Sequence, residues 1–243
     1  MRAVVVGLVA LLSLVRPALA EDEEPVVPEA NYPALAVTGV SPEAFVPQGW
    51  FIETKAAGDL NGDGLEDFAL VLRDKDPKNL LTGGMYGETP FDTNPRLLAV
   101  VFADTAGGAY RLGLENHSLI PRPDNPSQED PLSESGGVSI DHGSLKVGLY
   151  LFMSAGGWDM GVTSYRFRYE KDDFRLIGYD NYNVNRGSGR INDVSINLLT
   201  GKVVIKVGSI SDDKDKTTVS TLKKNPVLRI GDVGDGSGFA PQY

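Results

Sequence analysis

The residues with the clearest chemical pattern lie in one glycine-rich stretch of the chain, GDLNGDGLED at positions 58–67. Its oxygen-bearing side chains occupy alternate places, and Gly64 allows a sharp turn after the third of them. Calcium takes about six to eight oxygen ligands, and alternate residues of a curled loop can all turn toward one ion. The spacing therefore predicts a Ca2+ site. The predicted ligands are the side chains of Asp59, Asn61 and Asp63, the backbone carbonyl of Leu65, and Asp67, directly or through water.

The residue at the twelfth place of this pattern indicates which kind of calcium loop to expect. An EF-hand requires a bidentate glutamate there, whereas this chain has Leu70 inside an apolar run. The loop is therefore expected to lead into a strand. Magnesium suits the pattern less, because it demands a stricter octahedron. The alternative without a metal is a turn in which the same side chains accept hydrogen bonds from their own backbone.

The loop and the residues after it resemble a known repeat. The sequence GDLNGDGLEDFA at 58–69 looks like the calcium loop and following strand of FG-GAP (VCBS-type) repeats, the blade modules of integrin-like β-propellers and of many secreted bacterial proteins. The wider segment 46–72 is similar to a group of uncharacterised exported bacterial proteins with a single such loop. This resemblance implies a β-rich, exported, calcium-binding protein. The loop occurs once here, so a full propeller is not expected.

The elements that must position this loop are expected to be strands of antiparallel sheets. Short apolar runs and strict alternation, as in YRFRY at 165–169, are typical of strands, whereas helix signals are limited to one turn near 41–46. The predicted fold is mostly β, a meander of antiparallel sheets with few short helices. The expected strands are residues 68–72, 96–103, 109–114, 137–140, 144–153, 162–170, 174–179, 193–199 and 202–207.

The ends of the chain differ in composition from its middle. Residues 1–20 contain Arg2, an apolar run and a final Ala-Leu-Ala, which predicts a cleaved signal peptide, export to the periplasm or beyond, and no membrane span after cleavage. A second Gly-Asp cluster near the C-terminus and the charged residues 212–216 are interpreted as a tail and a solvated turn. The predicted organisation is a signal peptide at 1–20, a flexible tether at 21–40, a calcium-loop β region at 41–115, an antiparallel β region at 137–230 and a flexible tail at 231–243.

Composition excludes several classes of protein. The 243 residues include 23 basic and 33 acidic side chains, a net charge of −10 that argues against binding to nucleic acid. The absence of cysteine excludes a disulfide scaffold and a thiolate metal site. The two histidines, His117 and His142, have no metal-ligand spacing, and no nucleophile motif accompanies them. No catalytic residue is assigned.

A partner surface is expected in the C-terminal half of the chain. Trp158 in a glycine-rich loop would anchor a partner or a sugar ring. Arg166 and Arg168 would bind an anionic group of the partner. The alternatives are a core tryptophan and arginines on the solvated face of a sheet. The predicted function is that of an exported, non-enzymatic binding protein with one structural Ca2+, such as an envelope inhibitor or immunity protein, whose partner is a protein or an envelope polymer. The alternative is an envelope hydrolase with a calcium-ordered loop.

Overall fold

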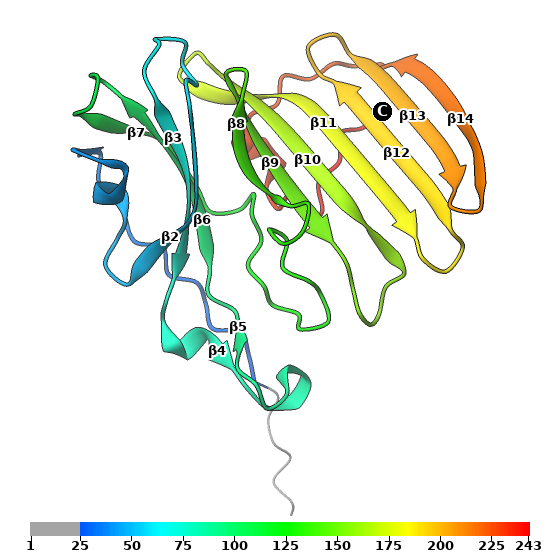
Figure 1. Ribbon diagram of the computed structural model, residues 1–243, viewed down its shortest axis with the longest axis horizontal. Helices are drawn as coiled ribbons and strands as arrows, with labels where there is room; N and C mark the ends of the chain where they lie inside the picture. The colour runs from blue at the N-terminus through cyan, green and yellow to red at the C-terminus, as the bar shows by residue number, and fades with distance from the viewer. Residues whose placement is uncertain (1–24) are drawn as a thin grey trace, which may run out of the picture.

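The computed structural model describes residues 25–243, so the predicted signal peptide lies outside the described residues. The chain forms a five-stranded and a seven-stranded antiparallel sheet, with a small two-stranded ladder below them in Figure 1. Helical structure in this part of the chain is limited to three short 3-10 turns and one α-helical turn. The predicted fold class is therefore confirmed: antiparallel β-sheets with few short helices, and no propeller among residues 25–243.

The five-stranded sheet has the order β1-β7-β6-β3-β2. Two of its three inner strands, β3 and β6, contain continuous apolar runs at 68–72 and 97–103 because both faces of these runs are buried, as predicted for residues 68–72. β2 was not expected, since most of its side chains are half-buried or exposed and its sequence has no apolar run. The strands are β1 (Thr38–Gly39), β2 (Trp50–Gly58), β3 (Asp67–Asp74), β6 (Arg96–Ala103) and β7 (Tyr110–Asn116). The ladder is β4 (Leu80–Leu81) with β5 (Phe91–Asp92), and the 3-10 turns are η1 (Pro42–Phe45), η2 (Pro77–Asn79) and η3 (Gly84–Tyr86).

The seven-stranded sheet is a meander in which each strand pairs with the next in sequence. The expected turn at 212–216 is instead the beginning of its last strand, β14. This strand has a neighbour on one side only and its described side chains face water, so its charged residues are compatible with a strand. The strands are β8 (Gly137–Asp141), β9 (Ser144–Leu151), β10 (Asp159–Glu170), β11 (Asp173–Asn185), β12 (Arg190–Asn197), β13 (Lys202–Ser209) and β14 (Asp212–Thr221).

The two sheets share one hydrophobic core. Val71 and Phe102 from the five-stranded sheet pack with Phe167, Phe174 and other residues of the seven-stranded sheet. The sheets meet where β8 lies against β2, so closely that a Cβ atom on Gly58 would lie 2.6 Å from the Ile140 side chain. The core therefore extends across both sheets.

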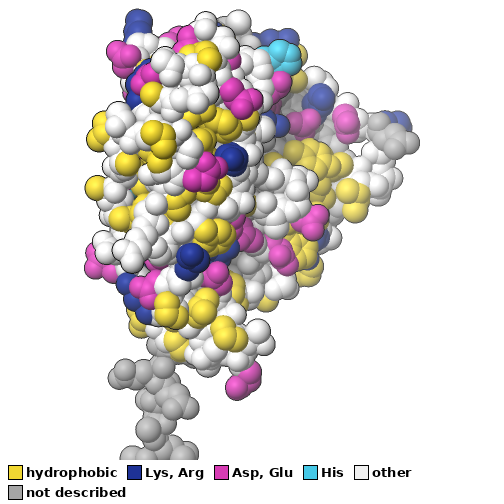
Figure 2. Space-filling view, turned by 60° about the vertical axis from the view of Figure 1, so that its left-hand side comes forward, with side chains coloured by type: hydrophobic (Ala, Val, Ile, Leu, Met, Phe, Trp, Pro, Cys, Tyr) yellow, Lys and Arg dark blue, Asp and Glu magenta, His cyan; other side chains and the backbone are white. Residues whose placement is uncertain are grey.

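The N-terminal segment covers the other face of the five-stranded sheet. Leu35 and Phe45 pack with Leu70, Leu72 and Leu97 in a second core cluster. The structure thus places residues 25–40 of the expected tether against the sheet, because β3 and β6 have a second apolar face that must be covered. On this side of the molecule, hydrophobic side chains are scattered among charged ones (Figure 2).

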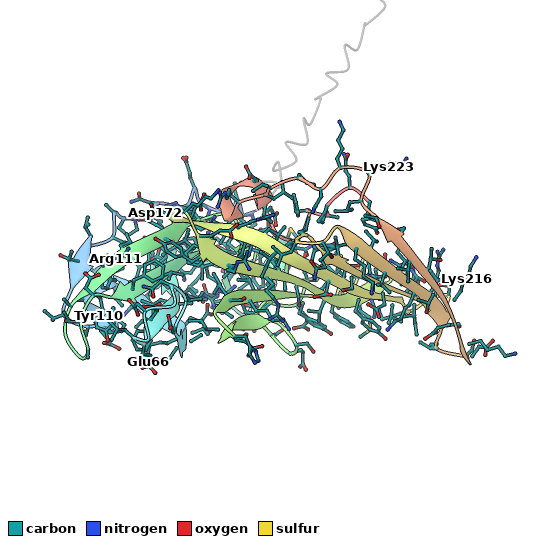
Figure 3. The ribbon with its side chains drawn as sticks, turned by 90° about the horizontal axis from the view of Figure 1, so that it is seen from above. Glu66, Tyr110, Arg111, Asp172, Lys216 and Lys223 are labelled. Atoms are coloured by element: carbon teal, nitrogen blue, oxygen red, sulfur yellow. The ribbon has the colours of Figure 1, made fainter. Side chains whose placement is uncertain are left out.

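The C-terminal segment likewise packs on the fold, where a flexible tail was expected. Ile230 and Val233, in the single turn of α1 (Ile230–Val233), belong to the shared core. The buried hydroxyl of Tyr165 lies 2.5 Å from the carbonyl oxygen of Gly236 and 2.9 Å from that of Phe239. Figure 3 shows the chain after Lys223 running over one face of the seven-stranded sheet. An open meander needs such a cover for its apolar face.

Replacing Tyr165 by phenylalanine is expected to lower the free energy of unfolding by about 1–2 kcal/mol, since two buried carbonyls lose their donor. Burial raises the pKa of this phenol, so the unfolded chain ionises first and stability falls as the pH rises above about 10. The variant should show a smaller alkaline loss. Urea unfolding at neutral and alkaline pH measures both effects, with the exposed Tyr182→Phe as the control; equal behaviour of the two variants would contradict the prediction.

Candidate functional site

The predicted calcium loop connects β2 to β3 and has the backbone shape that its glycines require. Gly62 and Gly64 have φ angles of +81° and +83°, in the left-handed region that disfavours other residues. The carboxylate of Asp59 lies inside the bend, where it accepts hydrogen bonds from the backbone N–H of Gly62 at 2.6 Å and of Gly64 at 2.9 Å. The two glycines and the first aspartate together fix the conformation of the loop.

Asn61 and Asp63 continue the same arrangement. Asn61 Oδ1 accepts a hydrogen bond from the Asp63 N–H at 2.9 Å, and Asp63 Oδ1 accepts one from the Leu65 N–H at 2.8 Å. The Asn61 amide also donates to Asp63 Oδ2 at 3.0 Å. The side chains of Asp59, Asn61 and Asp63 thus occupy one exposed loop and cap its backbone, as in the metal-free alternative.

The chemistry of these donors fits a hard cation, because every one is oxygen and each carboxylate oxygen retains a further lone pair. Their placement is that of a capped turn. Within residues 25–243, no group of three or more acidic or histidine side chains is gathered closely enough to hold a metal ion.

Asp67 has a different position from the other predicted ligands. It is completely buried, and its two oxygens accept hydrogen bonds at 2.9 Å from the N–H of Leu60 in the loop and of Ala103 at the end of β6. Burial raises the pKa of the Asp67 carboxyl and the nearby charge of Asp63 raises it further, whereas the backbone hydrogen bonds lower it. In this structure Asp67 anchors the loop to the next strand of the sheet.

The two histidines each lie beside a carboxylate at the surface. His142 Nδ1 is 2.6 Å from Asp141 Oδ1, but its side chain is 90% exposed. His117 stacks on Tyr32 with ring centroids 4.1 Å apart and is 2.8 Å from Glu115. The exposed His142 pair does not form the enclosed acid–base site that a hydrolase would use.

Trp158 is 67% exposed in the loop between β9 and β10, and Arg186 holds that loop in place. The guanidinium of Arg186 donates to the carbonyls of Met153 and Gly157 and lies 4.4 Å from the centre of the Phe152 ring. Its backbone N–H donates to the Trp158 carbonyl at 2.7 Å. An exposed aromatic ring is therefore presented on a loop with a fixed conformation.

A polar hollow of about 490 Å³ lies next to Trp158. Sequence reasoning missed it, although its signal is visible as alternating asparagines in NYNVN at 181–185. Trp158 comes directly before the lining residue Asp159 in the chain. Its ring lies beside Gly187, which comes directly before the lining residue Ser188. The lining residues are Asp159, Asn183, Asn185, Ser188, Arg190 and Asn192.

The structure separates the arginines that were expected to accompany Trp158. Arg168 pairs with Glu170 at 3.0 Å, and Arg166 lies 3.7 Å from Asp141. Both belong to the end of β10 that lies away from the Trp158 loop. Arg186 and Arg190 are the arginines close to Trp158.

Comparisons with protein-family models, with curated proteins and with solved structures find no match for this chain. In the described part of the chain, no helix has the length and apolar character needed to cross a membrane.

Proposed function

We propose that this chain is an exported, non-enzymatic binding protein that presents the surface around Trp158 to a protein or polymer of the cell envelope. The observation that carries the proposal is the exposure of Trp158 on a loop held by Arg186 beside a polar hollow. Tryptophan combines a large apolar surface with a rigid shape and is enriched at the centres of interfaces. A loop that is already ordered loses little conformational entropy on binding.

We further propose that the loop between β2 and β3 binds one structural Ca2+ through Asp59, Asn61, Asp63 and the carbonyl of Leu65. The oxygen donors, their alternate spacing and the two left-handed glycines support this assignment. In Figure 1 this loop is at the upper end of the sheets, and the β9–β10 loop with Trp158 is at the lower end. The ion would stabilise the fold from a place remote from the partner.

Calcium is expected to raise the thermal unfolding midpoint of EDTA-treated protein, and magnesium is expected to have little effect. A metal that binds only the folded state adds about 2.7 kcal/mol at a hundred times its dissociation constant. Asp63→Ala should abolish the response, and Asp235→Ala, from the second Gly-Asp cluster, should retain it. If calcium does not change the unfolding midpoint of the wild-type protein, the metal assignment is wrong and the loop is a capped turn.

Replacing Trp158 by alanine is expected to abolish capture of the partner without unfolding the protein. Because the ring is largely exposed, the free energy of unfolding should change by no more than about 0.5 kcal/mol. Immobilised wild-type and variant proteins are incubated with the envelope fraction of the producing cells, and the retained protein and polysaccharide are measured. Phe51→Ala, at an exposed position of β2, is the control. Undiminished capture by the Trp158 variant would refute the proposed surface.

A further inference from the structure

We infer that the hollow beside Trp158 binds a saccharide chain, with the tryptophan as a stacking platform and the asparagines as hydrogen-bonding partners of the sugar hydroxyls. This inference rests on the proposed binding function and specifies its ligand. It depends on the position of the hollow in the sheet, on the unpaired amides in it and on the adjoining aromatic ring.

The hollow is the uncovered continuation of the core face of the seven-stranded sheet. Side chains alternate along a strand, so Asn181 and Asn183 of β11 follow the buried Tyr179 on the same face. On β12, Asn192 shares a face with the buried Val194 in the same way. At its other end this face is covered by the five-stranded sheet and by the C-terminal segment. The change from apolar to amide side chains therefore marks the place where the sheet face meets water.

Two amides in the hollow are free to bind a ligand. Asn183 lies directly opposite Asn192 in the pairing of β11 with β12, and opposite Gly161 in the pairing with β10. The side chains of Asn183 and Asn192 form no hydrogen bond within residues 25–243, and Arg190 forms no ion pair there. Each amide both donates and accepts, which matches the donor and acceptor character of a hydroxyl group.

The rim of the hollow is already ordered. The Asn185 amide donates to Asp159 Oδ1 at 2.9 Å, and Asn185 Oδ1 accepts from both the N–H and the hydroxyl of Ser188 at 2.9 Å. These bonds join the first residue of β10 to the β11–β12 hairpin. A ligand would therefore meet polar groups that are already in place, which lowers the conformational entropy lost on binding.

Trp158 supplies the apolar part of the site. A Cβ atom on Gly187 would lie 3.4 Å from the indole ring, an ordinary van der Waals distance, so the ring lies beside the backbone of the β11–β12 hairpin. A pyranose ring has an apolar C–H face and a rim of hydroxyl groups, which match an indole face beside planar amides. The volume of about 490 Å³ is within the range of about 300–1,000 Å³ typical of small-ligand sites.

Other ligand classes fit the hollow less well. The net charge of −10 disfavours nucleic acids, and the carboxylate of Asp159 offsets the charge of Arg190, so the lining of the hollow has no net positive charge for a phosphorylated ligand. An extended peptide would require an open sheet edge, whereas the hollow lies on the face of three inner strands. Hydroxyl-rich sugars without a phosphate agree with both observations.

Tryptophan fluorescence provides a direct test. The chain has two tryptophans, and Trp50 is buried whereas Trp158 is exposed, so a ligand that stacks in the site should alter the emission of Trp158. The probes are cellohexaose, laminarihexaose, chitohexaose and hexagalacturonate, titrated into the full protein. At least one should give a saturable blue shift, with a dissociation constant on the order of 1 mM or tighter. Trp158→Phe should lose the fluorescence response.

Isothermal titration calorimetry of matched variants then localises the binding. Asn192→Ala should weaken the affinity about tenfold or more, because it removes a hydrogen-bonding side chain from the hollow. Ser195→Ala, on the opposite face of the same strand, should bind as the wild type does. A sugar that binds equally well to the Asn192 and Ser195 variants would overturn the proposed site.

The results separate the saccharide inference from the proposed function. If no probe binds, while capture of envelope material still requires Trp158, the saccharide inference is refuted and the binding function stands. If a sugar binds in an Asn192-dependent manner, the inference is supported. If neither a sugar nor the captured material depends on Trp158, both are refuted.

Discussion

Replacing Asp67 by alanine is expected to lower the free energy of unfolding by about 2–6 kcal/mol. The carboxylate is completely buried and is the acceptor for two backbone N–H groups, one in the loop and one at the end of β6. Its removal leaves two buried donors unsatisfied, at a cost of about 1–3 kcal/mol each. Urea unfolding of the two proteins measures the difference. Glu66→Ala, the exposed neighbouring acid, should cost less than about 0.5 kcal/mol.

The effect of Asp67 also depends on pH, with a sign that follows from its burial. Burial raises the pKa of the carboxyl in the folded protein above its usual value of 3.8. The folded state therefore holds the proton more tightly, and stability decreases as the pH rises from that usual value through the raised pKa. The alanine variant lacks this dependence, so its deficit should grow as the pH falls through the window. A deficit that does not change with pH would contradict the raised pKa, and one as small as that of Glu66→Ala would contradict the anchoring role.

Replacing Arg96 by leucine is expected to cost about 3 kcal/mol of stability. The Arg96 side chain is 1% exposed and binds Glu53 of β2 at 2.5 and 2.8 Å, and Asp130 of the segment between the two sheets at 2.6 Å. Burial by itself would lower the pKa of Arg96, but the hydrogen bonds to Glu53 and Asp130 hold it above the usual value, so the side chain remains charged. Removing Arg96 takes away the ion-pair partner of Asp130 and leaves Glu53 with Arg73 alone, and a partly buried charge without its partner is destabilising. Chemical unfolding measures the loss.

Two further variants separate the buried charge from the loss of packing. Lys55→Ala removes an exposed pair with Glu43 and should cost less than about 1 kcal/mol. In the Arg96 variant Glu53 keeps one cationic partner, Arg73, at 2.9 Å. The double variant Arg96→Leu with Glu53→Leu should recover part of the stability, because it removes this partly compensated acid while Arg73 keeps its ion pair with Asp92. An Arg96 variant no less stable than the Lys55 variant would show that this network contributes little.

Much of the sheet structure could be predicted because the residues of each such strand themselves show the pattern of a strand. β3 and β6 are buried on both faces, so their sequences are continuous apolar runs that are easy to identify. β2 and β14 have no such run, because one is half-covered and the other faces water, and their pairing is set by neighbours distant in sequence. The segments at 25–40 and 231–243 are ordered by the apolar sheet faces that they cover, which the Pro- and Ala-rich composition of the first and the Gly-rich composition of the second do not indicate.

The candidate site could be predicted only in part. The shape of the 58–67 loop followed from its glycines, and calcium binding there stays a prediction. The position of Asp67, between the loop and β6, depends on a contact with Ala103, 36 residues away in the sequence. The asparagines of β11 alternate visibly, but a sequence does not show which end of a sheet face remains uncovered. The hollow beside Trp158 therefore became evident only from the packing of the two sheets.

The charged sequence of β14 has a consequence for the protein at high concentration. Its outer side offers unpaired backbone groups to which a strand of another molecule could add, extending the sheet from one copy to the next. Asp212, Lys214, Asp215 and Lys216 make this association unfavourable, because a new neighbour would have to displace water from their charges. The charged residues that made β14 look like a turn in the sequence would thus also keep the protein from aggregating.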